Sequence, residues 1–298
     1  MKATRADEAL FTGSQRLLQR VLRSRGWRHE VAEIHGAAVG YYDVAGTGSG
    51  PPVLLVHGLG GTAHGYVRLV PGLLRHFRRV LVPDLPGHGL SPPAPGGALP
   101  LQRQLEVLEA FARRTVEAPA LVVGNSLGGA MSVLLAHRAP SLVRALALVA
   151  PAGARVAPGR MAEVFRALSV KDAAGARALI RRLFHRPPAS FLALAHPLRH
   201  MFGTEAVMAA FRELDPDTAG LAPEELQRLS QPVLLLWGAS DRLLPPEGVE
   251  YFRAHLPTHA EVHVVKGFGH VPQVERPAEV LQHLLDFSGR WGLLHAAR

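Results

Sequence analysis

Residues 121–129 read Leu-Val-Val-Gly-Asn-Ser-Leu-Gly-Gly, and this stretch decides the fold. Its first three residues are a short apolar run that is typical of a buried strand, and Leu127 to His137 have the pattern of a helix. A serine between two glycines at such a strand-to-helix turn fits the pattern G-x-S-x-G, in which a sharp turn exposes the hydroxyl above a sheet. The free N–H groups at the helix start favour negative charge beside the serine. The stretch therefore predicts Ser126 as a nucleophile.

Short apolar runs on both sides of this stretch alternate with helical patterns, which predicts a mostly parallel sheet with helices on both faces. The expected strands are Val31–Ile34, Ala38–Tyr42, Val53–His57, Val80–Pro83, Leu121–Gly124, Ala145–Val149, Val233–Gly238 and Glu261–Val265. The first two strands predict a hairpin, and the other six are continuous apolar runs, as expected for strands buried on both faces. Helices are expected over residues 63–75, 101–116, 127–137, 246–255 and 277–290.

The alternation of strands and helices stops at Pro151 and restarts at Val233. Only short amphipathic pieces lie between them, and these predict helices over residues 159–169, 172–184, 189–201, 204–214 and 223–230. We therefore expect an α/β core of residues 27–150 and 232–298 with an all-helical cap (lid) over residues 151–231. Such an insertion usually faces the substrate. An independent helical domain is the alternative, and the lack of linkers at either end argues against it.

A serine hydroxyl needs a neighbouring base, and histidine is the usual one. Among the sixteen histidines, His270 follows the last expected strand, and Asp241 follows the strand Val233–Gly238. The carboxyl ends of parallel strands meet at one edge of a sheet, so these side chains are expected near Ser126. The chain order Ser, Asp, His predicts a catalytic triad of Ser126, Asp241 and His270. Asp84 also follows a strand and is the rival acid, although its Asp-Leu-Pro-Gly turn indicates loop architecture.

The strand Val53–His57 ends in His-Gly-Leu-Gly-Gly. The backbone N–H groups of Leu59 and Leu127 are expected to form an oxyanion hole that binds an acyl oxygen. His57 itself is expected to support this loop through hydrogen bonds. The same glycines fit G-x-G-x-x-A, a dinucleotide-binding pattern. The preceding hairpin makes this the third strand rather than the first, which argues against a nucleotide cofactor.

Taken together, these motifs resemble an α/β-hydrolase with a helical cap over about Val31 to Leu285. The matching blocks are Leu54–Gly61, Asp84–Ser91, Gly124–Gly129, Leu234–Asp241 and Gly269–Pro277. The resemblance implies a mostly parallel eight-stranded α/β-hydrolase sheet. The start of the cap, Ala150–Gly153, is similar to monoacylglycerol-lipase-like members. Asn125 also occurs in the carbon–carbon bond hydrolases of aromatic degradation, in which an aromatic residue commonly follows the catalytic histidine; here that residue is Val271.

We therefore expect a serine hydrolase that cleaves carboxylic esters of apolar acyl substrates, similar to carboxylesterases and lipases. Apolar cap residues suit an acyl chain or an aromatic group, and Phe165 and Phe202 are the expected substrate-binding residues. A carbon–carbon bond hydrolase, an acyltransferase or a thioesterase on the same triad are alternatives, and so is a ligand receptor on a hydrolase scaffold. No cofactor is expected. No metal is expected either, because Pro197 interrupts the spaced pair His196 and His200 and no third ligand is evident.

Composition sets further limits. The chain of 298 residues has no cysteine, which excludes disulfides, thiolate metal sites and cysteine nucleophiles. The net charge is +9, but only three of the 33 basic residues are lysine, and the arginines are spread along the chain, so we expect no nucleic-acid binding. Residues 1–25 lack the apolar core of a secretory signal, which predicts a cytoplasmic location. Apolar and arginine residues alternate at helical spacing over residues 10–25. The helix of residues 1–26 either docks on the core or makes peripheral contact with a membrane.

Overall fold

The computed structural model describes residues 5–157, 159–193, 195, 201–202, 204–205, 207–209 and 220–294. An eight-stranded sheet has the strand order β1-β2-β4-β3-β5-β6-β7-β8. The strands are β1 Arg28–Ile34, β2 Ala37–Ala45, β3 Val53–Val56, β4 Arg79–Pro83, β5 Ala120–Asn125, β6 Val143–Val149, β7 Val233–Gly238 and β8 Glu261–Val265. β1 and β2 form an antiparallel hairpin, β2 pairs antiparallel with β4, and all remaining pairs are parallel. The predicted α/β sheet is thereby confirmed.

The central strands are buried on both faces because helices cover both sides of the sheet. Every residue of β3, β5 and β7 is buried. Successive residues of these strands belong alternately to two apolar clusters, one on each face of the sheet. For β8 the prediction of two buried faces is wrong. This strand lies at the edge of the sheet with β7 as its only neighbour there, and Val264 is 45% exposed.

The core helices are α3 Leu101–Thr115, α4 Leu127–Arg138, α11 Glu247–His255 and α13 Pro277–Arg290, close to their predicted bounds. The helix expected over residues 63–75 is divided into η1 Ala63–Tyr66, a single 3₁₀ turn, and α2 Val70–Leu73. Pro71 has no N–H to donate to the preceding turn, so a helix begun at Ala63 cannot continue through it. Three short helices were not predicted as separate elements: α2 itself, η2 Pro140–Leu142 and α12 Pro272–Glu275.

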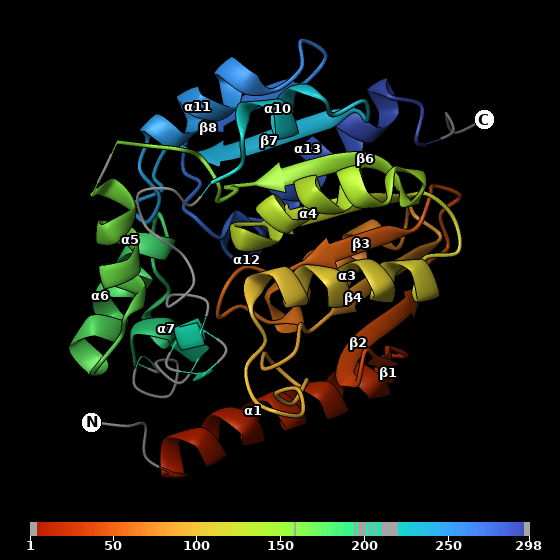
Figure 1. Cartoon of the computed structure of the whole chain (residues 1–298). Coiled ribbons are helices and arrows are strands. Elements are labelled where there is room, and N and C mark those ends of the chain that lie inside the picture. The colour runs from red at the N-terminus through yellow and green to blue at the C-terminus, as the bar shows by residue number, and fades with distance from the viewer. Residues whose placement is uncertain are drawn as a thin grey trace.

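Helices alternate with loops between β6 and β7, and the described residues of this segment include no strand. The helices whose bounds lie within the described residues are α5 Arg160–Leu168, α6 Ala173–Leu183, α7 Ala189–Ala193 and α10 Pro223–Gln227. Figure 1 shows α5, α6 and α7 gathered beside the sheet, on the side toward which the arrowheads of β3, β6 and β7 point. These helices therefore lie at the carboxyl edge of the strands. Parts of the helices predicted over residues 189–201 and 204–214, and both His196 and His200, lie outside the described residues.

The N-terminal helix α1 Arg5–Ser24 runs along the hairpin side of the molecule (Figure 1). Leu22 is buried, and Leu18 packs against the same apolar cluster. Gln15 of α1 also hydrogen-bonds the ring of His64, which in turn contacts the hydroxyl of Tyr42 at 2.7 Å. The carboxyl-terminal part of α1 is thus docked on the core. No helix within the described ranges is long and apolar enough to cross a bilayer.

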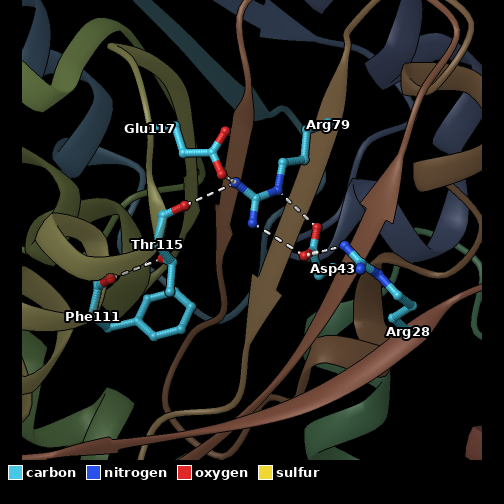
Figure 2. Close-up of polar contacts among 6 residues, drawn as sticks. All are labelled: Arg28, Asp43, Arg79, Phe111, Thr115 and Glu117. Carbon is cyan, nitrogen blue, oxygen red and sulfur yellow. Dashed lines mark hydrogen bonds and ion pairs between the residues drawn. The ribbon is translucent and has the colours of Figure 1, made fainter.

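An ionic network ties the hairpin to the rest of the sheet (Figure 2). Asp43 of β2 accepts hydrogen bonds from Arg28 of β1 at 2.8 Å and from Arg79 of β4 at 2.8 and 3.1 Å. Arg79 also reaches Glu117 at 3.1 Å and donates to the carbonyl oxygen of Thr115 at 3.0 Å. The hydrogen bond to the buried Asp43 carboxylate raises the pKa of Arg79. The network lies away from the carboxyl edge of the strands and contributes stability.

Candidate active site

Ser126 stands at the turn between β5 and α4. Its backbone has φ 55° and ψ −123°, a conformation that costs energy for a residue with a side chain. Four backbone hydrogen bonds hold the turn. The N–H of Ser126 donates to the carbonyl of Val149 at 3.1 Å, and the carbonyl of Ser126 accepts from Gly129 and Ala152 at 2.9 Å each and from Ala130 at 3.3 Å. A Cβ on Gly128 would lie only 2.3 Å from the carbonyl oxygen of Val56, so this position excludes any larger residue. The side chain of Ser126 is half-buried at the carboxyl edge of the sheet.

His270 and Asp241 are in direct contact. Nδ1 of His270 lies 2.8 Å from Oδ2 of Asp241, and the two side chains are only 3% and 0% exposed. The other carboxylate oxygen accepts the backbone N–H groups of Leu243 at 2.8 Å and Leu244 at 3.0 Å. Both carboxylate oxygens of Asp241 therefore accept hydrogen bonds. Because a carboxylate can only accept, the ring nitrogen that faces it, Nδ1 of His270, carries the proton. Nε2 is therefore left as an acceptor.

Asn125 connects the serine turn with the histidine loop. Its side-chain amide donates to the carbonyl oxygens of Val149 at 2.9 Å and His270 at 3.0 Å. This contact places the backbone of His270 beside the residue that precedes Ser126. No hydrogen bond joins Ser126 Oγ to His270 within the residues that the structure describes. In structures without substrate, such bonds are often long and tighten when substrate binds. The sequence alone did not predict this role of Asn125, because a buried amide has no motif that names its partners.

The loop after β3 lies against the serine turn. Neither the N–H of Leu59 nor that of Leu127 donates a hydrogen bond within the described part of the chain, and Leu127 is the first residue of α4. Both residues line one small cavity of about 10 Å³, which is room for a single water molecule. Neither N–H group therefore has a protein acceptor among the described residues.

His57 supports this loop. Its Nε2 accepts the N–H of Leu85 at 3.0 Å, and its Nδ1–H donates to the carbonyl of Gly58 at 2.8 Å. Burial and, to a smaller extent, the nearby ring of His88 together lower the pKa of His57 from 6.5 to about 3. The imidazole is consequently neutral at neutral pH and locked in one tautomer. Both of its nitrogens are occupied.

Asp84, the rival acid, is buried elsewhere. Its two carboxylate oxygens accept the N–H of Ala63 at 2.6 Å and that of Leu90 at 2.9 Å. Burial raises the pKa of Asp84 from 3.8 to about 7, and these two hydrogen bonds act in the opposite direction. The acid that contacts His270 is Asp241, whereas Asp84 joins two loops beside β3 and β4.

The two predicted substrate-binding residues lie in different surroundings. A Cβ on Gly60 would stand 2.8 Å from the ring of Phe202, so this cap residue touches the loop that carries Leu59. Phe165 lies in α5 and packs, partly buried, against the core cluster. Within the described residues, no group of three or more His, Cys, Asp or Glu side chains is arranged to hold a metal ion.

A strained serine turn and a histidine paired with a buried aspartate lie at one edge of a mostly parallel sheet, beside a group of helices. This arrangement is that of a hydrolase of the α/β class. The model of the alpha/beta hydrolase fold family matches residues 51–277, and the chain belongs to this family. Its relatives include esterases and lipases, which are hydrolases that act on ester bonds.

Two curated relatives and one solved structure illustrate the range of this family. The chain is 33% identical over 272 residues to a pimeloyl-[acyl-carrier protein] methyl ester esterase from Sodalis glossinidius, which covers 83% of this chain and 97% of the relative. It is 31% identical over 273 residues to the dihydrolipoyllysine-residue acetyltransferase component of an acetoin cleaving system from Pseudomonas putida, covering 89% of this chain and 70% of the relative. A crystal structure of a bacterial membrane phospholipase A has a TM-score of 0.82 and 26% identity, with coverage of 95% of this chain and 93% of that one.

Proposed function

We propose that the chain is a serine hydrolase that cleaves carboxylic esters of apolar acyl groups through an acyl-enzyme intermediate. The observation that carries this proposal is the buried hydrogen bond from His270 Nδ1 to Asp241 Oδ2 at 2.8 Å. It leaves Nε2 of His270 as the only free nitrogen of the ring, and Asn125 holds the same residue beside the serine turn. A base that is fixed in this tautomer can take a proton from a serine hydroxyl.

In the proposed reaction, Ser126 Oγ attacks the ester carbonyl carbon while its proton passes to Nε2 of His270. The carbonyl oxygen becomes an oxyanion that the N–H groups of Leu59 and Leu127 stabilise. The tetrahedral intermediate collapses when Nε2 returns the proton to the leaving alkoxide, so that an alcohol departs and an acyl-serine remains. Water then attacks the acyl carbon by the same route and releases the carboxylic acid and the free serine.

One observation favours an apolar acyl group, and another favours an ester as the substrate. The cap side chains Met161, Phe165, Leu183 and Phe202 pack partly buried against the core cluster, so the cap offers an apolar surface at the carboxyl edge. The relatives named as an esterase of a methyl ester and as a phospholipase support hydrolysis of carboxylic esters. Acyl transfer is the second candidate, because one relative is named as an acetyltransferase component.

A rate series over acyl chain length tests this proposal. Purified enzyme is given p-nitrophenyl esters from acetate to long chains, and kcat/KM is expected to rise by up to about fourfold for each methylene, equivalent to about 0.8 kcal/mol. Phe202→Ala is expected to flatten the long-chain end and spare acetate. Met208→Ala, which truncates an exposed apolar side chain of the cap, is the control. A flat series, or turnover of a vinylogous diketone without ester turnover, would contradict the proposal.

A product assay separates hydrolysis from acyl transfer and from binding alone. With a long-chain ester in water, the proposed enzyme releases one carboxylic acid for each alcohol, also when glycerol or a thiol is present as an alternative acceptor. Preferential formation of the acylated acceptor would identify an acyltransferase. Saturable binding without release of alcohol would identify a receptor.

We also propose that α1 makes peripheral contact with an anionic membrane surface. On the described part of this helix, Leu17 is 62% and Val21 is 38% exposed, next to the arginines Arg16, Arg20 and Arg23. Co-sedimentation with vesicles of anionic phospholipid tests this contact. Binding is expected to fall at high salt and in the double variant Leu17→Ser/Val21→Ser. Equal recovery of the parent and this variant with the vesicles would contradict it.

A further inference from the structure

The end of the cap helix α6 lies directly against the loop that carries His270. The carbonyl oxygen of Leu183 accepts the backbone N–H of His270 at 2.7 Å and that of Val271 at 3.3 Å. These are contacts to the main chain of the histidine itself. The position of this residue therefore depends on where the cap lies.

Glu275 forms a second connection between the end of the cap helix and the loop that carries His270. One of its carboxylate oxygens accepts the N–H of His185 at 3.0 Å, and the other accepts the N–H of Arg186 at 2.7 Å. Glu275 belongs to the short helix α12, whose turn begins at Val271. A single carboxylate thus accepts two hydrogen bonds from successive backbone N–H groups, those of His185 and Arg186. Hydrogen bonds to a charged acceptor are the stronger kind.

Apolar packing and close approach reinforce these ties. Phe184 and Ile180 of the cap form a small apolar cluster against which Val271, just before α12, and Val274, within α12, are packed. A Cβ on Gly269 would lie 2.5 Å from the carbonyl oxygen of Leu183 and 2.7 Å from the N–H nitrogen of His185. The absence of a side chain at residue 269 is what lets the cap approach this closely.

The cap also contacts the loop of the catalytic acid. Nδ1 of His185 lies 2.8 Å from the hydroxyl of Ser240, the residue before Asp241. The N–H of Arg242, the residue after it, donates to the carbonyl of Arg182 at 3.3 Å. One cap segment, residues 182–186, therefore borders both members of the histidine–aspartate pair.

We infer that Glu275 is a positioning residue, and that the cap sets the place of His270 as well as covering the substrate. The inference rests on the proposed function, in which Nε2 of His270 must meet the hydroxyl of Ser126. A displacement of about 1 Å between reacting groups costs on the order of 100-fold in rate. Removing the Glu275 carboxylate releases the N–H groups of His185 and Arg186, which loosens the segment that holds the backbone of His270.

The test compares Glu275→Ala and Glu275→Gln with the matched control Glu279→Ala. Glu279 lies four residues further along the chain, where it forms an exposed ion pair with Arg276. Glu275→Ala is expected to lower kcat by about 10–100-fold with KM within about threefold of the parent. Glu275→Gln is expected to lie between Glu275→Ala and the parent, because its amide oxygen still accepts one N–H. The control is expected to match the parent.

Hydrogen–deuterium exchange of the His270 and Val271 amides gives a readout that does not depend on turnover. Exchange at both amides is expected to be faster in Glu275→Ala and unchanged in Glu279→Ala. Equal exchange in Glu275→Ala and the parent, or kcat within twofold of the parent, would overturn the inference. If Glu275→Ala does not fold, Glu275→Gln takes its place. Faster exchange at the two amides and a several-fold loss of kcat are then expected, and values equal to those of the parent would overturn the inference. Ester turnover that persists in Ser126→Ala would instead refute the proposed function, while the exchange data still test the tie.

Discussion

Asp241→Asn exchanges one carboxylate oxygen for an amide nitrogen without changing the size of the side chain. In the parent, Oδ1 accepts two backbone N–H groups, from Leu243 and Leu244, and Oδ2 accepts Nδ1–H of His270. The new amide keeps its oxygen toward the two backbone donors, because the reverse orientation would set its NH₂ group against both of them. Its nitrogen therefore faces His270.

This orientation inverts the tautomer of the histidine. A donor at the former Oδ2 position requires Nδ1 of His270 to act as an acceptor, so the ring proton moves to Nε2. The nitrogen that should accept the proton of Ser126 is then blocked. We expect kcat/KM to fall by about 10³–10⁴-fold. At 1.36 kcal/mol for each factor of ten, this corresponds to about 4–5.5 kcal/mol of transition-state stabilisation.

The assay is steady-state hydrolysis of a p-nitrophenyl ester, combined with the Tm and with nitrogen NMR of labelled histidine. The Tm is expected to change little, because each hydrogen bond in the variant has a donor and an acceptor. The NMR spectrum is expected to show His270 with its proton on Nε2. A loss of less than tenfold, or an unchanged tautomer, would refute this reasoning.

Three further predictions concern stability. Asp84→Asn sets an amide NH₂ against the N–H of Ala63 or Leu90, so the free energy of unfolding is expected to fall by about 1–3 kcal/mol with activity retained; a loss of activity without destabilisation would reassign the orienting acid. Burial lowers the pKa of His57 to about 3 from 6.5, so the stability it supplies is present above pH 6.5 and is lost as the pH falls toward 3. Urea unfolding is expected to show that the free energy of unfolding falls more steeply between pH 6.5 and 4 in the parent than in His57→Gln. Equal dependence of this free energy on pH in the two proteins would contradict the prediction. Asp43→Ala leaves Arg79 without its buried partner and is expected to lower the free energy of unfolding by about 1–3 kcal/mol. Arg28→Ala, at an arginine that is 65% exposed, is expected to lower it by less than about 1 kcal/mol in the same assay. Equal losses in the two variants would contradict the role given to the buried Asp43–Arg79 pair.

The sheet could be predicted because each of its central strands is a short, continuous run of apolar residues in the sequence. The central runs, such as Leu121–Gly124, recur in the structure with both ends within two residues of the predicted bounds. The edge position of β8 could not be read from its sequence. Glu261 to Val265 have the strand pattern, but the exposure of Val264 depends on strand order, which is a property of the whole sheet.

The positions of Ser126, Asp241 and His270 at one edge followed from strand ends and chain order. Their supporting contacts did not. The amide of Asn125 and the carboxylate of Glu275 bind backbone groups up to 145 residues away in the sequence, and a backbone N–H or carbonyl carries no residue-type signal. The division of the helix expected over residues 63–75 has a local cause in Pro71, which has no N–H to donate to the preceding turn.

Covalent labelling of the serine is the most direct test of the central claim. The parent is treated with a fluorophosphonate and digested, and the adduct is located by mass spectrometry. One adduct is expected, on the peptide that contains Ser126, with loss of ester turnover in proportion to labelling. Ser126→Ala is expected to lack both the adduct and the turnover, with a Tm close to that of the parent. An adduct on another residue, or more than a few per cent of the parent turnover in Ser126→Ala, would contradict the assignment of Ser126 as the nucleophile.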